Sequence, residues 1–166
     1  IMSQRVQSIL FFLSAFLFAT LFFLPLAEYY GELNILRFNA YGVESLLPNG
    51  ESPFGNWFAL PVLILTVTAI LLGVYLSVSL LKAVKMAQFQ RLHRFAKINV
   101  AVIVAWIAVA CVYNFILTKQ PGLDGPCFSG KAFGAFLPLV ALLFSVLASN
   151  GLKKDIKRVR STDRIR

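Results

Sequence analysis

Long stretches without charged residues dominate the hydrophobic pattern of the chain, and each has about the length of a membrane-crossing helix. A helix needs about 20 mostly apolar residues to cross about 30 Å of hydrocarbon at about 1.5 Å per residue. Four stretches meet this requirement, at about residues 6–26, 57–81, 98–118 and 132–149. One charge at the centre of a span costs about 2.5 to 3.5 kcal/mol. Four uncharged stretches therefore predict four transmembrane helices.

The amino-acid composition also indicates a membrane protein and excludes a soluble domain. The 166 residues are 58% hydrophobic and 14% charged, whereas soluble domains carry about 25% charged residues. The formal net charge of +9 would indicate nucleic acid as a partner of a soluble protein. Here the basic residues lie beside the apolar stretches, where such residues report orientation and contact with anionic lipid. We therefore expect membrane lipids, and no nucleic acid, as partners.

The distribution of Lys and Arg predicts an orientation in the membrane. Of the 16 basic residues, 13 lie before the first span, in the segment 82–97 or in the tail 150–166, and three lie in the segments 27–56 and 119–131. Cytoplasmic loops carry the excess of Lys and Arg. The pattern predicts cytoplasmic N and C termini, a cytoplasmic loop 82–97, a cytoplasmic tail 150–166, and extracytoplasmic loops 27–56 and 119–131.

The connecting segments differ in their expected structure. Residues 33–43 alternate roughly between apolar and polar positions, which predicts a short strand or hairpin. Segment 119–131 is rich in Pro and Gly, which predicts no regular structure. Segment 82–97 mixes apolar and basic positions and is expected to continue the second span before a tight reversal. Tyr29, Tyr30 and Trp57 are expected to anchor the ends of loop 27–56 in the headgroup layer, and a partner-docking surface is the alternative.

The tail combines a helical pattern with a cluster of basic residues. Asn150 and Gly151 are typical of a helix stop or kink. Leu152, Ile156 and Val159 then recur at the spacing of one helix face. The remaining positions predict contact with anionic lipid or with a partner, and the basic residues concerned are Lys153, Lys154, Lys157, Arg158 and Arg160.

Small residues recur at four-residue spacing within the spans. Such rows let helix backbones approach closely in lipid, where apolar burial gives no drive for association. The rows predict a compact four-helix bundle, but the same faces could take the helix of a partner, for which the row of the second span is the best candidate. The rows are Ala15 and Ala19; Ala69, Gly73 and Ser77; Ala101 and Ala105; and Ala141, Ser145 and Ser149.

Candidate chemistry is sparse along the chain. The spans contain no ionisable group of the kind that transport or proton relay requires. The chain has no Ser-His-Asp set, no paired carboxylates within membrane reach and no glycine-rich phosphate loop. His93 is the only histidine, and Cys111 and Cys127 lack metal-ligand spacing. We therefore expect no catalytic, cofactor-binding or metal-binding residues and no enzymatic activity, and we expect bound lipids.

These features together predict an all-α membrane protein, a four-transmembrane-helix bundle with a partly ordered extracytoplasmic loop and a basic, amphipathic C-terminal tail helix. A chain with packing faces and no evident chemistry favours a non-enzymatic accessory or structural subunit of a larger membrane complex. The alternative is a binding or carrier protein for a lipid, quinone or other small apolar molecule, which the 16 Phe residues and the uncharged interior favour.

The two ends of the chain and the segment MAQFQRLHRFAKIN resemble an uncharacterised family of four-span membrane proteins of Bacteroidota. The resemblance covers essentially the whole chain and implies four helices and a multi-pass location in the bacterial inner membrane, with no activity. Ile156 departs from the family pattern, which has an acidic residue after the sequence KKD. The likeness is carried by Arg5, Gln7, Pro25, Leu26, Pro138, Lys154, Asp155, Ser161, Asp163, Arg164 and Arg166.

Overall fold

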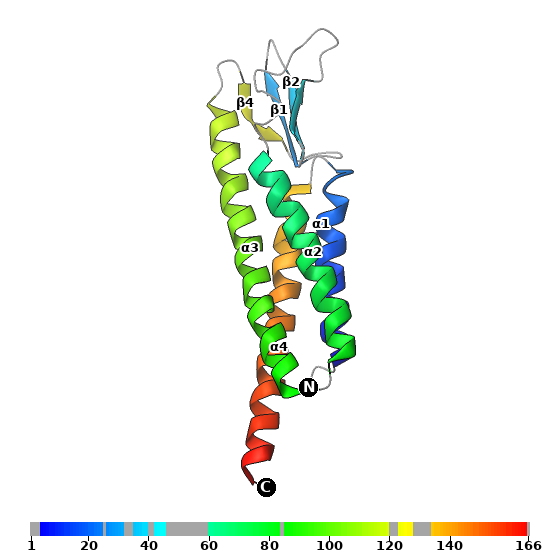
Figure 1. Ribbon diagram of the computed structural model, residues 1–166. Helices are drawn as coiled ribbons and strands as arrows, with labels where there is room; N and C mark the ends of the chain where they lie inside the picture. Colours follow the sequence, from blue (N-terminus) through cyan, green and yellow to red (C-terminus); the bar gives the residue numbers. More distant parts are fainter. Residues whose placement is uncertain are drawn as a thin grey trace.

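The computed structural model describes residues 4–24, 26–31, 35–39, 42–45, 60–83, 85–119, 123–127 and 134–165. Within these residues the fold is mostly helical, with four α-helices and a small antiparallel sheet (Figure 1). The helices are α1 (Gln4–Thr20), α2 (Leu60–Lys82), α3 (Met86–Thr118) and α4 (Leu137–Ile165), and a short 3-10 helix, η1 (Gly134–Phe136), precedes α4. The sheet covers one end of the helices, and both chain termini lie toward the other end.

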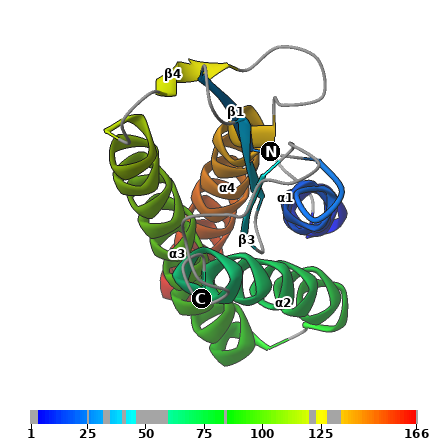
Figure 2. The ribbon, with the colours of Figure 1, turned by 90° about the horizontal axis from the view of Figure 1, so that it is seen from above.

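The helices lie side by side in a closed order, in which α1 and α3 each contact both α2 and α4 (Figure 2). Three of them, Leu60–Lys82, Ala87–Thr118 and Leu137–Ser161, are long and apolar enough to cross a membrane, whereas Arg5–Thr20 is a shorter apolar helix. Large side chains on the outer surface fit this assignment, since Phe12, Leu71 and Leu143 are 53%, 64% and 64% exposed. An apolar surface of this extent requires lipid or protein around it.

The boundary between the second and third helices corrects the sequence prediction. The basic segment 86–97 is the beginning of α3 and does not continue the second span, because α2 ends at Lys82. Lys85 is extended, and its backbone N–H donates to Oε1 of Gln88 at 3.1 Å, which caps the new helix. The buried positions of the basic segment are also in phase with those of the apolar part of α3, as Leu92, Ala96, Asn99, Ile103 and Trp106 show.

The fourth helix corrects the expected break at Asn150 and Gly151. α4 continues through both residues as one helix and extends beyond the other helices at its C-terminal end (Figure 1). Gly151 is buried, and Leu152 is only 1% exposed within a core cluster that includes Phe11 and Leu92. Burial of a leucine side chain stabilises by about 1.5 to 3 kcal/mol, which exceeds the helix penalty of about 1 kcal/mol for a glycine.

The sheet has four strands in the order β3-β2-β1-β4, and all neighbouring strands are antiparallel. β1 (Ala27–Gly31), β2 (Ile35–Asn39) and β3 (Gly42–Ser45) confirm the strand or hairpin expected within residues 33–43 and extend it on both sides. β4 (Leu123–Cys127) shows that the expectation of no regular structure in segment 119–131 is wrong. The strand forms because the edge of β1 offers its backbone N–H and C=O groups as hydrogen-bond partners. The composition of the Pro- and Gly-rich segment alone does not predict this pairing.

Alternation along β2 fixes which face of the sheet meets the helices. Leu36 and Phe38 are buried, while Ile35 before them and Arg37 between them are partly exposed. The ring of Phe38 stacks on that of Tyr113 in α3, with 5.7 Å between centroids. The sheet therefore packs directly on the helices and closes one end of their interior.

Candidate functional site

Gly73 marks the closest approach between α1 and α2. A Cβ at this position would lie 2.7 Å from Cβ of Ala15 and 3.1 Å from the carbonyl oxygen of Phe11. One turn further along α2, Oγ of Ser8 donates to the carbonyl oxygen of Ser77 at 2.7 Å and lies 3.0 Å from Oγ of Ser77. Ala69 is also buried, at 2% exposure. The row Ala69, Gly73 and Ser77 therefore packs inside the chain and presents no free face to a partner.

The small-residue row of α4 also faces the interior. Ala141, Ser145 and Ser149 are all buried. Oγ of Ser145 donates to Oγ of Ser14 in α1 at 2.9 Å and accepts from Nδ2 of Asn99 in α3 at 3.2 Å. These three polar side chains join three helices at one level and fix their mutual rotation.

Sequence reasoning missed most of the hydrogen bonds between helices. Nε1 of Trp106 in α3 donates to Oγ1 of Thr66 in α2 at 2.8 Å, and Thr66 in turn donates to its own helix backbone at 2.7 Å. Nε2 of Gln7 in α1 donates to Asp155 in α4 at 2.8 Å. The usable signal was a polar residue within an apolar stretch, as Asn99 is, since such a residue needs a partner in lipid.

The outward face of α3 is the exception among the small-residue rows. Ala101, Ala105 and Ala108 are exposed and recur at the spacing of one helix face. We call these three residues the α3 seam. Ile98 and Val112, which are 49% and 56% exposed, bound it at its two ends. Val104, which is 51% exposed, also lies on this face, and the outer faces of the other helices carry large side chains, including Phe16, Leu71 and Leu143.

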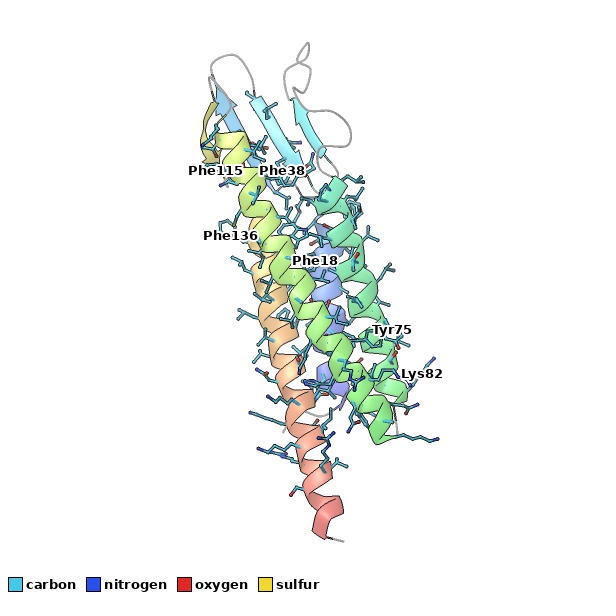
Figure 3. The ribbon with its side chains drawn as sticks, turned by 60° about the vertical axis from the view of Figure 1, so that its left-hand side comes forward. Phe18, Phe38, Tyr75, Lys82, Phe115 and Phe136 are labelled. Carbon is cyan, nitrogen blue, oxygen red and sulfur yellow. The ribbon has the colours of Figure 1, made fainter. Side chains whose placement is uncertain are left out.

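A pocket of about 230 Å³ lies where the sheet meets α3, η1 and the start of α4. Its lining is largely aromatic and aliphatic and comes from all of these elements (Figure 3 labels Phe38 and Phe136). Ala110 and Cys111 of α3 contribute to its wall, and Cys111 is free and exposed. The pocket is open in part and has room for an apolar group. The remaining lining residues are Leu26, Tyr29, Trp106, Ile107, Asn114 and Leu139.

One polar pair, Tyr29 and Asn114, lies in the wall of this pocket. The Tyr29 hydroxyl donates to Oδ1 of Asn114 at 2.5 Å, and Tyr29 is fully buried. Burial raises the pKa of the Tyr29 phenol well above its usual range, so the hydroxyl stays protonated as a donor. The expectation that Tyr29 anchors the chain in the headgroups is wrong, because its ring is enclosed by protein. The Tyr30 side chain and Trp57 lie outside the described residues.

An ion pair within the sheet accounts for two charges near the pocket. Glu28 and Arg37 are directly opposite each other on β1 and β2, and their side chains approach to 3.1 Å. Glu28 is only 8% exposed, so this pairing avoids an isolated buried carboxylate. Among the described residues, no group of three or more His, Cys, Asp and Glu side chains could hold a metal ion.

The opposite end of the helices is basic. The tail residues Lys153, Lys154, Lys157, Arg158 and Arg160 are all exposed, and their contact with anionic lipid or a partner stays a prediction. Ile156 is partly buried against the helices, whereas Val159 is 47% exposed. The apolar face of the tail is thus covered by the protein only over its first turns.

His93 lies in this basic region, in the first part of α3 and before the apolar stretch 98–118. Its Nδ1 is buried without a hydrogen-bond partner among the described residues. Burial lowers the pKa of His93 below its usual value of 6.5, and the charges of Lys97 and Lys153 lower it further. The imidazole is therefore neutral near pH 7.

Comparison with known proteins gives one match. No curated protein and no solved structure was found to be similar to this chain. A family model described as "Domain of unknown function (DUF4293)" matches residues 3–165, which include all four helices and the sheet. The chain therefore belongs to this family, the domain of unknown function DUF4293.

Proposed function

We propose that the chain is a non-enzymatic, four-span protein of the bacterial inner membrane that serves as an accessory or structural subunit of a larger membrane complex. The membrane location is supported by the three long apolar helices. A fourth span at α1 is supported by its packing between α2 and α4. Cytoplasmic termini are supported by the basic residues at the end of the molecule opposite the sheet.

The α3 seam is the observation that carries the proposed association. Small residues on an outer helix face let a second helix approach closely, and this contact drives association in lipid. The small-residue rows of α1, α2 and α4 already pack against other helices of the same chain. Ala101, Ala105 and Ala108 are exposed, so the proposed occupant of this seam is a transmembrane helix of another subunit.

Affinity isolation of the full chain in mild detergent tests this proposal. We expect a defined membrane protein to co-purify with the wild-type chain in fixed stoichiometry. Ala105→Leu should abolish this recovery, because the larger side chain holds the two helices apart. Val67→Leu is the matched control, since it adds bulk at a 41% exposed position of α2. Recovery of the wild-type chain only as an 18.5 kDa monomer or small homo-oligomer would contradict the proposal.

A second candidate function is the binding of a lipid, quinone or other small apolar molecule. The pocket of about 230 Å³ beside Tyr29 and Asn114 favours it, because ligand sites combine apolar walls with a few placed polar groups. Mass spectrometry of the purified protein should then find one retained molecule. Ala110→Phe should displace this molecule by filling the pocket, while Val67→Leu should not. The absence of any specifically retained molecule in the wild-type protein would remove this candidate.

A further inference from the structure

A second pocket, of about 190 Å³, lies between the end of α2 and the beginning of α3. Its polar lining includes Ser79 and Lys82 of α2 and Gln88 and Arg91 of α3. It is at the opposite end of the molecule from the sheet, where the apolar surface of α2 stops at Lys82 (Figure 3). This position corresponds to the boundary between hydrocarbon and headgroups.

The charge around this pocket is positive and uncompensated. Within the residues that the structure describes, neither Lys82 nor Arg91 forms an ion pair, and the pocket lining contains no acidic residue. The first turn of α3 also lacks an acidic residue, so the positive end of its helix dipole adds to the field of the two cations. An anion is the ligand that this arrangement stabilises.

The other side of the pocket is apolar and lies further from the basic end of the helices, toward their apolar middle. Tyr75 precedes Lys82 by two helical turns, which is about 10 Å along α2, and Leu92 on α3 is 3% exposed. An edge-to-face contact with Phe95, with 5.5 Å between ring centroids, holds the Tyr75 ring in place. The exposed apolar surface continues from Tyr75 to Val78 and Leu71. A ligand with a charged head and an apolar tail matches this polar-to-apolar order.

We propose that this pocket binds the phosphate headgroup of an anionic phospholipid. Lys82 and Arg91 contact the phosphate, Ser79 and Gln88 supply hydrogen-bond donors, and one acyl chain runs along Tyr75 into the hydrocarbon. Basic pockets between transmembrane helices bind anionic lipid heads in this way. The inference rests on membrane insertion of the helices, and it does not depend on the partner proposed for the α3 seam.

Native mass spectrometry of the full chain in neutral detergent tests the site. The probes are dioleoyl phosphatidylglycerol, dioleoyl phosphatidylcholine and inorganic phosphate. We expect the wild-type chain to retain phosphatidylglycerol about tenfold more strongly than phosphatidylcholine, with no competition from millimolar inorganic phosphate. The double variant Lys82→Gln/Arg91→Gln should lose this preference. The double variant Arg94→Gln/Lys97→Gln, which removes the same charge at exposed positions of α3 outside the pocket, should keep it.

Several outcomes would overturn this inference. Equal retention of the two lipids, or equal loss in both double variants, would assign the binding to diffuse surface charge. Competition by inorganic phosphate would assign the pocket to a free anion. Tyr75→Ala tests the acyl-chain contact separately from the headgroup contact. It should weaken phosphatidylglycerol binding several-fold without altering the preference for its headgroup. Thermal unfolding of each lipid-free variant checks the fold, and the lipid comparison is made between variants that unfold like the wild type.

Discussion

Replacement of Gly73 by alanine tests whether the small-residue row of α2 serves packing within the chain. The added methyl would lie 2.7 Å from Cβ of Ala15, where ordinary contact begins at 3.4 Å. Neither group can turn away, because a methyl has no rotamer and the next contact, at 3.1 Å, is a backbone oxygen of Phe11. The two helices must therefore separate by about 0.7 Å, the difference between these two contact distances.

A separation of this size has a definite energetic cost. A gap of about 0.5 to 1 Å loses a quarter to a half of the dispersion energy of each contact across the interface. The hydrogen bond of 2.7 Å from Oγ of Ser8 to the carbonyl oxygen of Ser77 crosses the same interface and would lengthen. Overpacking of this kind destabilises proteins by about 1 to 3 kcal/mol. We expect Gly73→Ala to lower the free energy of unfolding by this amount.

The reciprocal exchange Ala15→Gly/Gly73→Ala supplies the control. It moves the methyl from α1 to α2 and removes the 2.7 Å contact, so it should recover most of the stability that Gly73→Ala loses. Unfolding of the purified chain in detergent, followed by circular dichroism, gives the four values of a double-mutant cycle. The reasoning fails if Gly73→Ala is as stable as the wild type, or if the effects of the two substitutions simply add.

Three further predictions address the basic end, the interior and the pocket. The folded state holds the pKa of His93 below 6.5, so the unfolded chain binds the proton first as pH falls. The contribution of His93 to stability is therefore full above about pH 6.5 and decreases below it. In thermal unfolding, His93→Gln should flatten this decrease. An unchanged pH profile would contradict this. A double-mutant cycle with Trp106→Phe and Thr66→Ala should give a coupling energy of about 0.6 to 1.7 kcal/mol. A coupling of zero would show that the hydrogen bond between these two side chains does not contribute to stability. In a Cys127→Ser background, Cys111 should react readily with a thiol reagent in the purified protein, and Ala110→Phe should slow the reaction; equal rates would show that the pocket does not govern access.

The sequence was sufficient to locate the second and third helices approximately, because their signal is the absence of charge over about 20 residues. The stretches at 57–81 and 98–118 each lie within or close to one helix of the structure, α2 and α3. Helix ends were harder to predict. Residues 86–97 join α3 because Leu92 and Ala96 continue its buried face, and this phase relation becomes visible only when the neighbouring helices are known.

Contacts between distant segments were beyond the sequence patterns. β4 forms because β1 offers it a free edge, and the Pro- and Gly-rich segment itself carries no strand signal. Four-residue spacing finds rows of small residues, but it could not tell inner from outer faces of the helices. Gly73 meets Ala15 across an interface, whereas Ala105 has the same spacing and faces outward. Spacing defines a face of a helix, and only the neighbours decide whether that face is free.

The two candidate functions share α3, and its inner contacts explain why one helix could serve both. Asn99, Trp106 and Asn114 bind α4, α2 and the sheet in turn, at intervals of about two helical turns. These bonds fix both the rotation and the height of α3, so its outer seam is a preformed surface, and a rigid surface loses less entropy when a partner docks. The same bonds place Trp106 and Asn114 in the pocket wall. Substitutions on the outer face, such as at Ala105, therefore separate association from ligand binding, whereas substitutions on the inner face would disturb both together.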